Sequence, residues 1–144
     1  MFKKLALIGA ITVLVAACGG STATKAPEES EAAAPSQAVP AGARTVDLEI
    51  GAGVITPAVV IVKRGETITF VAKNVSDAQV ELIVGTQTDV DADSGDSLKE
   101  AEEIEPGMSK SVTYTFDGDG PYAFGDQIGD HYAAGAKGTV DLQP

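Results

Sequence analysis

Apolar and polar positions alternate through most of the chain after residue 45. Val46, Leu48 and Ile50 are separated by polar residues, which is the period-two pattern of a strand with one buried face. Short runs rich in β-branched and aromatic residues follow at 58–62, 68–72, 80–84, 112–116, 122–124 and 140–142. No segment has a sustained helical period, so the pattern predicts about seven or eight short strands.

Turn-forming residues separate these apolar runs. Residues 63–66 (Lys-Arg-Gly-Glu) and 117–121 (Asp-Gly-Asp-Gly-Pro) are the clearest examples, because glycine, proline and aspartate favour chain reversal. Short strands joined by such turns are typical of a β-sandwich. The sequence therefore predicts one all-β domain over residues 45–144, a Greek-key antiparallel β-sandwich.

The N-terminal segment has the layout of a secretory signal. Lys3 and Lys4 precede an apolar run over residues 5–15, which is too short to span a bilayer because spanning needs about 20 residues. Two alanines then stand directly before Cys18. This order resembles the lipobox of bacterial lipoproteins. The resemblance implies cleavage of residues 1–17 and attachment of diacylglycerol to the thiol of Cys18.

The lipid anchor determines the predicted location of the domain. Cys18 is the only cysteine, so the folded domain has neither a disulfide nor a thiolate. Residues 18–44 are mainly Ala, Pro, Ser, Thr, Glu and Gly, a composition that predicts a disordered linker. We expect a domain in the cell envelope, outside the cytoplasm, held to a membrane by its N-terminal lipid. The alternative is an ordinary secreted protein whose cysteine is incidental.

The net charge limits the kinds of partner. The chain carries a formal charge of −11, and an acidic surface repels the phosphates of nucleic acids and anionic lipid headgroups. We therefore expect no nucleic-acid partner. A basic envelope protein and cations remain compatible with this charge.

An acidic segment, residues 86–105, has two interpretations. Four of its carboxylates have the spacing of the oxygen ligands in a calcium loop. They are Asp89, Asp91, Asp93 and Glu100. The sharp-turn glycine, however, comes one residue late at Gly95, and no apolar helix precedes the loop. The segment is therefore either a weak calcium site or a solvated loop with a short helical turn near residues 98–103.

The order of motifs resembles that of the cupredoxins. The matching stretches are 56–62, Arg-Gly-Glu-Thr-Ile-Thr-Phe at 64–70, Asn74, Glu-Pro-Gly-Met-Ser at 105–109, and 120–140. In the family, the last stretch is a strand ending at a cysteine, a loop through a histidine to a methionine, and a final strand. The resemblance covers the whole predicted domain. It implies a cupredoxin-like sandwich and, by default, a copper electron-transfer carrier.

The copper ligands of the family are largely absent from this chain. His131 falls on the family's second histidine, whereas Val80, Asp126 and Ala136 fall on the first histidine, the cysteine and the methionine. A type 1 copper site needs two imidazoles and a thiolate, with a weak axial methionine. His131 is the only histidine, so the resemblance implies a degenerate site.

Two roles for the remaining polar residues stay open. Asp126 and His131, with Glu81, have the ligand types of a hard site for copper(II), zinc or another divalent metal. Alternatively, Asp126 and His131 hydrogen-bond each other and hold the loop in shape. Because this loop has no nucleophile beside His131, we expect a non-catalytic binding or accessory module rather than an enzyme.

Overall fold

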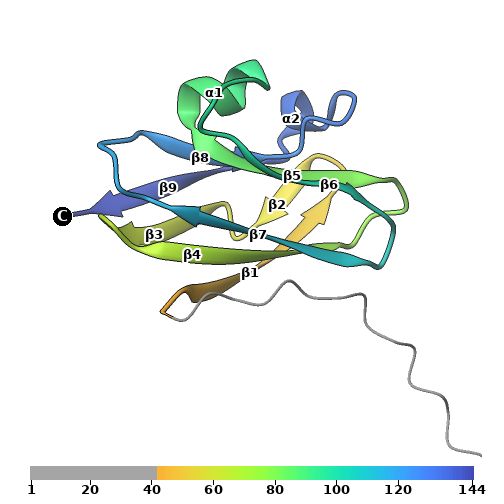
Figure 1. Cartoon of the computed structure of the whole chain (residues 1–144). Helices are drawn as coiled ribbons and strands as arrows, with labels where there is room; N and C mark the ends of the chain where they lie inside the picture. Colours follow the sequence, from red (N-terminus) through yellow and green to blue (C-terminus); the bar gives the residue numbers. More distant parts are fainter. Residues whose placement is uncertain (1–41) are drawn as a thin grey trace, which may run out of the picture. The chain divides into compact units, whose positions relative to one another are not determined.

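The structure is a computed structural model that describes residues 42–144, and this part contains nine strands and two short helices (Figure 1). The predicted signal, Cys18 and most of the predicted linker lie outside the described residues. The strands are β1 (Arg44–Gly51), β2 (Val54–Thr56), β3 (Val59–Lys63), β4 (Thr67–Asn74), β5 (Val80–Thr86), β6 (Lys99–Ile104), β7 (Ser109–Thr115), β8 (Tyr122–Gly125) and β9 (Lys137–Gln143). The helices are α1 (Gln87–Ala92) and α2 (His131–Ala134).

Two packed sheets form the domain. One has the strand order β2-β1-β4-β7 and the other has the order β3-β9-β8-β5-β6, with α1 and α2 on the same side as the second sheet (Figure 1). This arrangement confirms the predicted all-β sandwich. The sheets are mixed rather than antiparallel, because β1 pairs with β4 and β3 pairs with β9 in parallel. Each parallel pair arises where the chain leaves one sheet and returns to it from the other.

Pro57 marks the point at which the chain changes sheet. The predicted strand at 58–62 is preceded by the short strand β2, which pairs with β1, whereas β3 pairs with β9. Proline has no N–H to donate to a ladder, so it interrupts a strand. The interruption lets β2 end in one sheet and β3 begin in the other.

Aromatic and aliphatic side chains from both sheets fill the core. Phe70, Phe116 and Phe124 are fully buried, and the Phe70 ring lies 6.2 Å from Phe116 and 5.9 Å from Phe124, centroid to centroid. Burial alternates along β3 and β9, as the period-two pattern predicts. Burial of this apolar surface is the main favourable contribution to folding.

The acidic segment folds differently from the predicted loop. Its helix is α1, which starts where the hydroxyl of Thr86 accepts the backbone N–H of Asp89 (3.3 Å), an ordinary N-cap. The helical turn expected near residues 98–103 is wrong, because residues 99–104 form β6 and pair with β5. Ala101 and Ile104 on β6 are buried in the core. Tertiary pairing therefore determines the conformation there.

Neither helix within residues 42–144 has the length and apolar character that crossing a bilayer requires.

A matched pair of substitutions tests where the core lies. Ile68 on β4 is fully buried, whereas Ile61 on β3 is 62% exposed. We expect Ile68→Val to lower the free energy of unfolding by about 0.5–1.5 kcal/mol, because it removes a packed methylene. The same change at Ile61 should stay within about 0.5 kcal/mol of the parent. Urea denaturation measures both values, and equal losses would contradict this assignment of the core.

Candidate functional site

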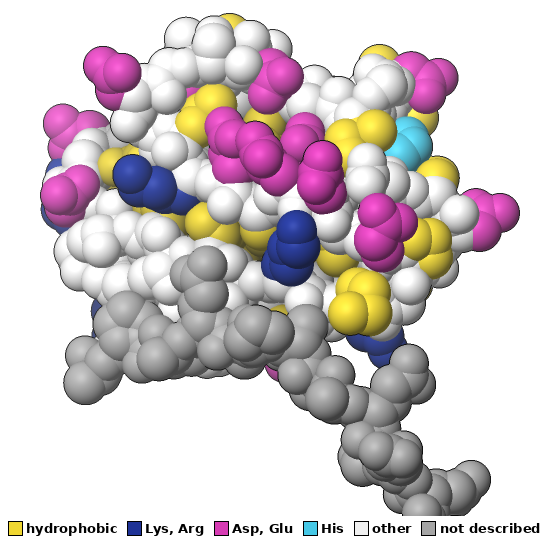
Figure 2. All heavy atoms as spheres, turned by 45° about the vertical axis from the view of Figure 1, so that its right-hand side comes forward, with side chains coloured by type: hydrophobic (Ala, Val, Ile, Leu, Met, Phe, Trp, Pro, Cys, Tyr) yellow, Lys and Arg dark blue, Asp and Glu magenta, His cyan; other side chains and the backbone are white. Residues whose placement is uncertain are grey.

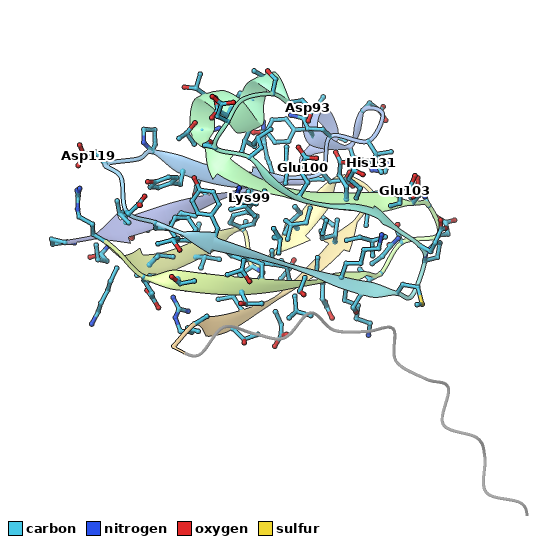
Figure 3. The ribbon with its side chains drawn as sticks, viewed as in Figure 1. Asp93, Lys99, Glu100, Glu103, Asp119 and His131 are labelled. Carbon is cyan, nitrogen blue, oxygen red and sulfur yellow. The ribbon has the colours of Figure 1, made fainter. Side chains whose placement is uncertain are left out.

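The loop between β8 and β9, residues 126–136, carries the residues that the resemblance singles out. β8 is buried along its whole length and delivers Asp126 directly to the interior. The backbone N–H of Asp126 donates to the carbonyl of Ala136 (3.0 Å), which closes the loop on itself. Within the loop, His131 is the first residue of α2, and Figure 3 labels it near Glu100 of β6.

The carboxylate of Asp126 is completely buried, and both of its oxygens are hydrogen-bonded. Its side chain has 0% exposure. Oδ1 accepts the backbone N–H groups of Glu81 (3.3 Å) and Ile128 (3.0 Å), and Oδ2 lies 2.8 Å from Nδ1 of His131. A buried carboxylate without such partners is strongly unfavourable. The carboxylate therefore ties together β5, the loop and the imidazole.

His131 is held by this carboxylate at one nitrogen only. Its side chain is 15% exposed, and Nδ1 is the atom that points toward Asp126. The loop backbone supports the position, because the N–H of His131 donates to the carbonyl of Ile128 (3.1 Å). The imidazole is thus fixed in orientation by its own loop and by a buried acid.

Glu81 lies beside this pair on β5. Its Oε1 accepts the backbone N–H of Gln127 (3.0 Å), so it also holds the loop. Burial raises the pKa of the Glu81 carboxyl above its ordinary value, and the negative charges of Asp126, Asp93 and Glu100 raise it further. The charged form of Glu81 is therefore disfavoured by its surroundings.

The four positions that the resemblance assigns to the copper ligands lie close together in this structure. Val80 precedes Glu81, whose N–H binds Asp126, and Ala136 accepts the N–H of Asp126. Val80 and Ala136 are fully buried. Type 1 copper requires two imidazoles and a thiolate. These four positions supply only one imidazole, that of His131, and a carboxylate, that of Asp126, because Val80 and Ala136 have apolar side chains. The residues present do not fit that centre.

The residues predicted as a hard metal site are neighbours joined by hydrogen bonds. Both oxygens of Asp126 are engaged, one oxygen of Glu81 binds a backbone N–H, and Nδ1 of His131 faces Asp126. Within residues 42–144, no group of three or more His, Cys, Asp or Glu side chains is arranged to hold a metal ion.

The four residues at calcium-loop spacing are not brought together. Asp89 and Asp91 lie on α1, Asp93 caps its C-terminus in a left-handed conformation, and Glu100 lies on β6. Asp89 accepts a hydrogen bond from the hydroxyl of Ser97. The helix turns successive carboxylates in different directions, so the twelve-residue calcium loop that the spacing suggested does not form.

A contact that the sequence did not reveal joins α1 to the loop. The hydroxyl of Tyr132 donates to Asp91 (2.6 Å), and the side-chain amide of Gln127 donates to the carbonyl of Val90 (2.7 Å). Burial, followed by the hydrogen bond to Asp91, raises the pKa of Tyr132 to about 12. The Tyr132 ring covers Gly125, where an added Cβ would lie 2.5 Å from the ring. In the sequence, the only sign of this contact was Gly125 itself, because a glycine at the end of a strand often marks a place where another group packs closely.

Acidic side chains gather on the face of the molecule that includes this region. Figure 2 shows them as a cluster, with the single histidine to one side of it. Figure 3 labels Asp93 at the C-terminal end of α1 and Glu100 on β6, and both raise the pKa of Glu81. The surface near His131 is therefore negative.

Comparison with known proteins establishes the family. Residues 10–140 match the cupredoxin-like domain family, so the chain belongs to that family, as the motifs predicted. No curated protein matches the chain in sequence.

Solved structures with the same fold include three auracyanins. Reduced auracyanin from Roseiflexus castenholzii has 24% identity and a TM-score of 0.62, with 72% of this chain and 99% of that chain covered. Auracyanin B has 18% identity and a TM-score of 0.62, with coverages of 78% and 97%. Auracyanin A from Chloroflexus aurantiacus, a blue copper protein, has 19% identity and a TM-score of 0.56, with coverages of 69% and 99%. These likenesses show the shared fold.

The raised pKa of Glu81 gives a stability prediction. Because the folded-state pKa lies above the unfolded-state value, its favourable contribution is present at low pH and is lost as the pH rises through the folded-state pKa. Glu81→Gln keeps an acceptor for Gln127 and removes the charge. We expect its free energy of unfolding at pH 7 to be equal to or above that of the parent, with the difference changing in favour of the parent in acid.

Chemical denaturation between about pH 3 and pH 7 measures this effect. Glu102→Gln is the control, because it removes the same charge from an exposed position on β6 and should change stability little at any pH. A loss of stability at pH 7 in Glu81→Gln alone would contradict the account of Glu81.

Proposed function

We propose that this chain is a non-catalytic, cupredoxin-like binding module of the cell envelope that works without a type 1 copper centre. One observation carries the proposal. The buried carboxylate of Asp126 stands at the position of the family's cysteine and hydrogen-bonds Nδ1 of His131 at 2.8 Å. Two residues at the positions of copper ligands, Asp126 and His131, therefore hydrogen-bond each other.

The ligand chemistry argues against an electron carrier. A blue copper site depends on a thiolate and two imidazoles, and the folded domain has no cysteine and only His131 as an imidazole. The fold alone does not specify a function. A copper electron-transfer role would need ligands from another chain.

A hard metal site is the second candidate. The observation in its favour is that Glu81, Asp126 and His131 are linked neighbours, and their ligand types suit copper(II) or zinc. Coordination through Asp126 or Nδ1 of His131 would require breaking hydrogen bonds that already satisfy a buried charge. We therefore place this candidate second, and weak calcium binding by the acidic segment behind it.

Among residues 42–144, no nucleophilic side chain is hydrogen-bonded to the His131 imidazole, which supports a non-catalytic role. The His131–Asp126 pair has the layout of a base and its orienting acid, but within the described part of the chain no hydroxyl hydrogen-bonds the imidazole. Such a pair can hold an imidazole for binding without taking part in a reaction.

The sequence supports a lipid anchor at Cys18 and a tether over residues 18–44. These features, which lie almost entirely outside the described residues, would hold the domain near a membrane on its outer side. The acidic surface around His131 favours a basic envelope protein as partner and disfavours nucleic acid.

A metal titration of the protein tests this proposal. We expect calorimetry and absorbance to show no tight site for copper(II), zinc or calcium and no intense blue band. His131→Ala and Asp126→Asn variants run beside the parent. Tight copper or zinc binding that both variants abolish would overturn the proposal in favour of the hard site. A blue band would show that the assignment of the ligand positions is wrong.

A further inference from the structure

The hydrogen bonds of Asp126 determine where the proton of His131 lies. Oδ1 already accepts two backbone N–H groups, from Glu81 and Ile128. An ionised carboxylate can only accept hydrogen bonds, so the 2.8 Å contact between Oδ2 and Nδ1 of His131 needs a proton on Nδ1. The neutral imidazole then carries its free lone pair on Nε2.

The second nitrogen of His131 faces solvent. No described residue hydrogen-bonds Nε2, and among the described residues no buried side-chain nitrogen or oxygen lacks a partner. Nε2 is therefore accessible, in agreement with the 15% exposure of the side chain. It lies in a loop braced by Tyr132 and Gln127 against α1, so its direction is fixed.

We propose that Asp126 is a positioning residue that holds His131 as the Nδ1–H tautomer and so presents Nε2 at the surface as an acceptor. The group this nitrogen suits is a hydrogen-bond donor on the module's protein partner. The inference rests on the proposed function for the existence of that partner. The tautomer itself follows from the geometry of the buried carboxylate.

The carboxylate is specifically required because an amide of the same shape reverses the pattern. In Asp126→Asn, the amide oxygen still accepts the N–H groups of Glu81 and Ile128, which leaves the NH₂ group facing Nδ1 of His131. An NH₂ group only donates, so Nδ1 must then accept and the proton moves to Nε2. The substitution should keep the fold and change the surface atom from an acceptor to a donor.

Long-range ¹H–¹⁵N correlation spectra of labelled protein test this directly. His131 is the only histidine, so an untagged protein gives one imidazole pattern. At about pH 8.5, where an imidazole is ordinarily neutral, we expect mainly the Nδ1–H tautomer in the parent and mainly the Nε2–H tautomer in Asp126→Asn. Asp130→Asn is the control, because Asp130 is exposed in the same loop and makes no side-chain cap. It should keep the parent pattern.

Each outcome decides the inference. An Nε2–H tautomer in the parent overturns it, whether or not Asp126→Asn folds, and so does an unchanged Nδ1–H pattern in a folded Asp126→Asn. Spectra recorded with a chelator separate this test from the proposed function. Tight metal binding would overturn the proposed function while the tautomer of the metal-free protein still tests the role of Asp126.

Discussion

The buried carboxylate of Asp126 needs hydrogen-bond partners for its charge, and the conformation of the loop between β8 and β9 supplies them. Asp126 is withdrawn completely from solvent, which would cost several kcal/mol if its charge had no partners. Two backbone N–H groups and one imidazole nitrogen meet its two oxygens. These contacts determine the path of the loop, the orientation of His131 and the distance between the loop and β5.

The sandwich supplies these partners from segments that are far apart in sequence. β8 lies between β5 and β9 in one sheet, so the end of β8 lies beside the start of β5 and the start of β9. This neighbourhood brings Glu81, Asp126 and Ala136 together. In this chain the neighbourhood holds a hydrogen-bonded acid and imidazole.

The strands could be predicted because the alternation of apolar and polar residues shows which face of each strand is buried. The runs at Val46–Ile50 and Ile68–Ala72 both became strands with buried inner faces. The parallel pairing of these two strands could not be predicted, since a period of two is the same in either direction. β6 was not predicted, because its two buried residues, Ala101 and Ile104, are three positions apart among exposed charged residues and so give no alternating pattern.

The site could be predicted in part. Position matching singled out Asp126 and His131 but left their relation open, because a ligand pair and a hydrogen-bonded pair need the same residue types. For the contact of Tyr132 with α1, the sequence offered only Gly125, a glycine at the end of a predicted strand. It could not identify the hydrogen bond between Tyr132 and Asp91, because this bond joins two segments that meet only after the sheet has formed.

The most direct test of the central claim is a crystal structure of the protein grown with copper(II) in excess, with data collected at the copper absorption edge. We expect Oδ2 of Asp126 to stay about 2.8 Å from Nδ1 of His131, within ordinary hydrogen-bond range, with no anomalous peak between them. An anomalous peak within bonding distance of Nδ1 of His131, with Asp126 turned away or coordinating, would contradict it.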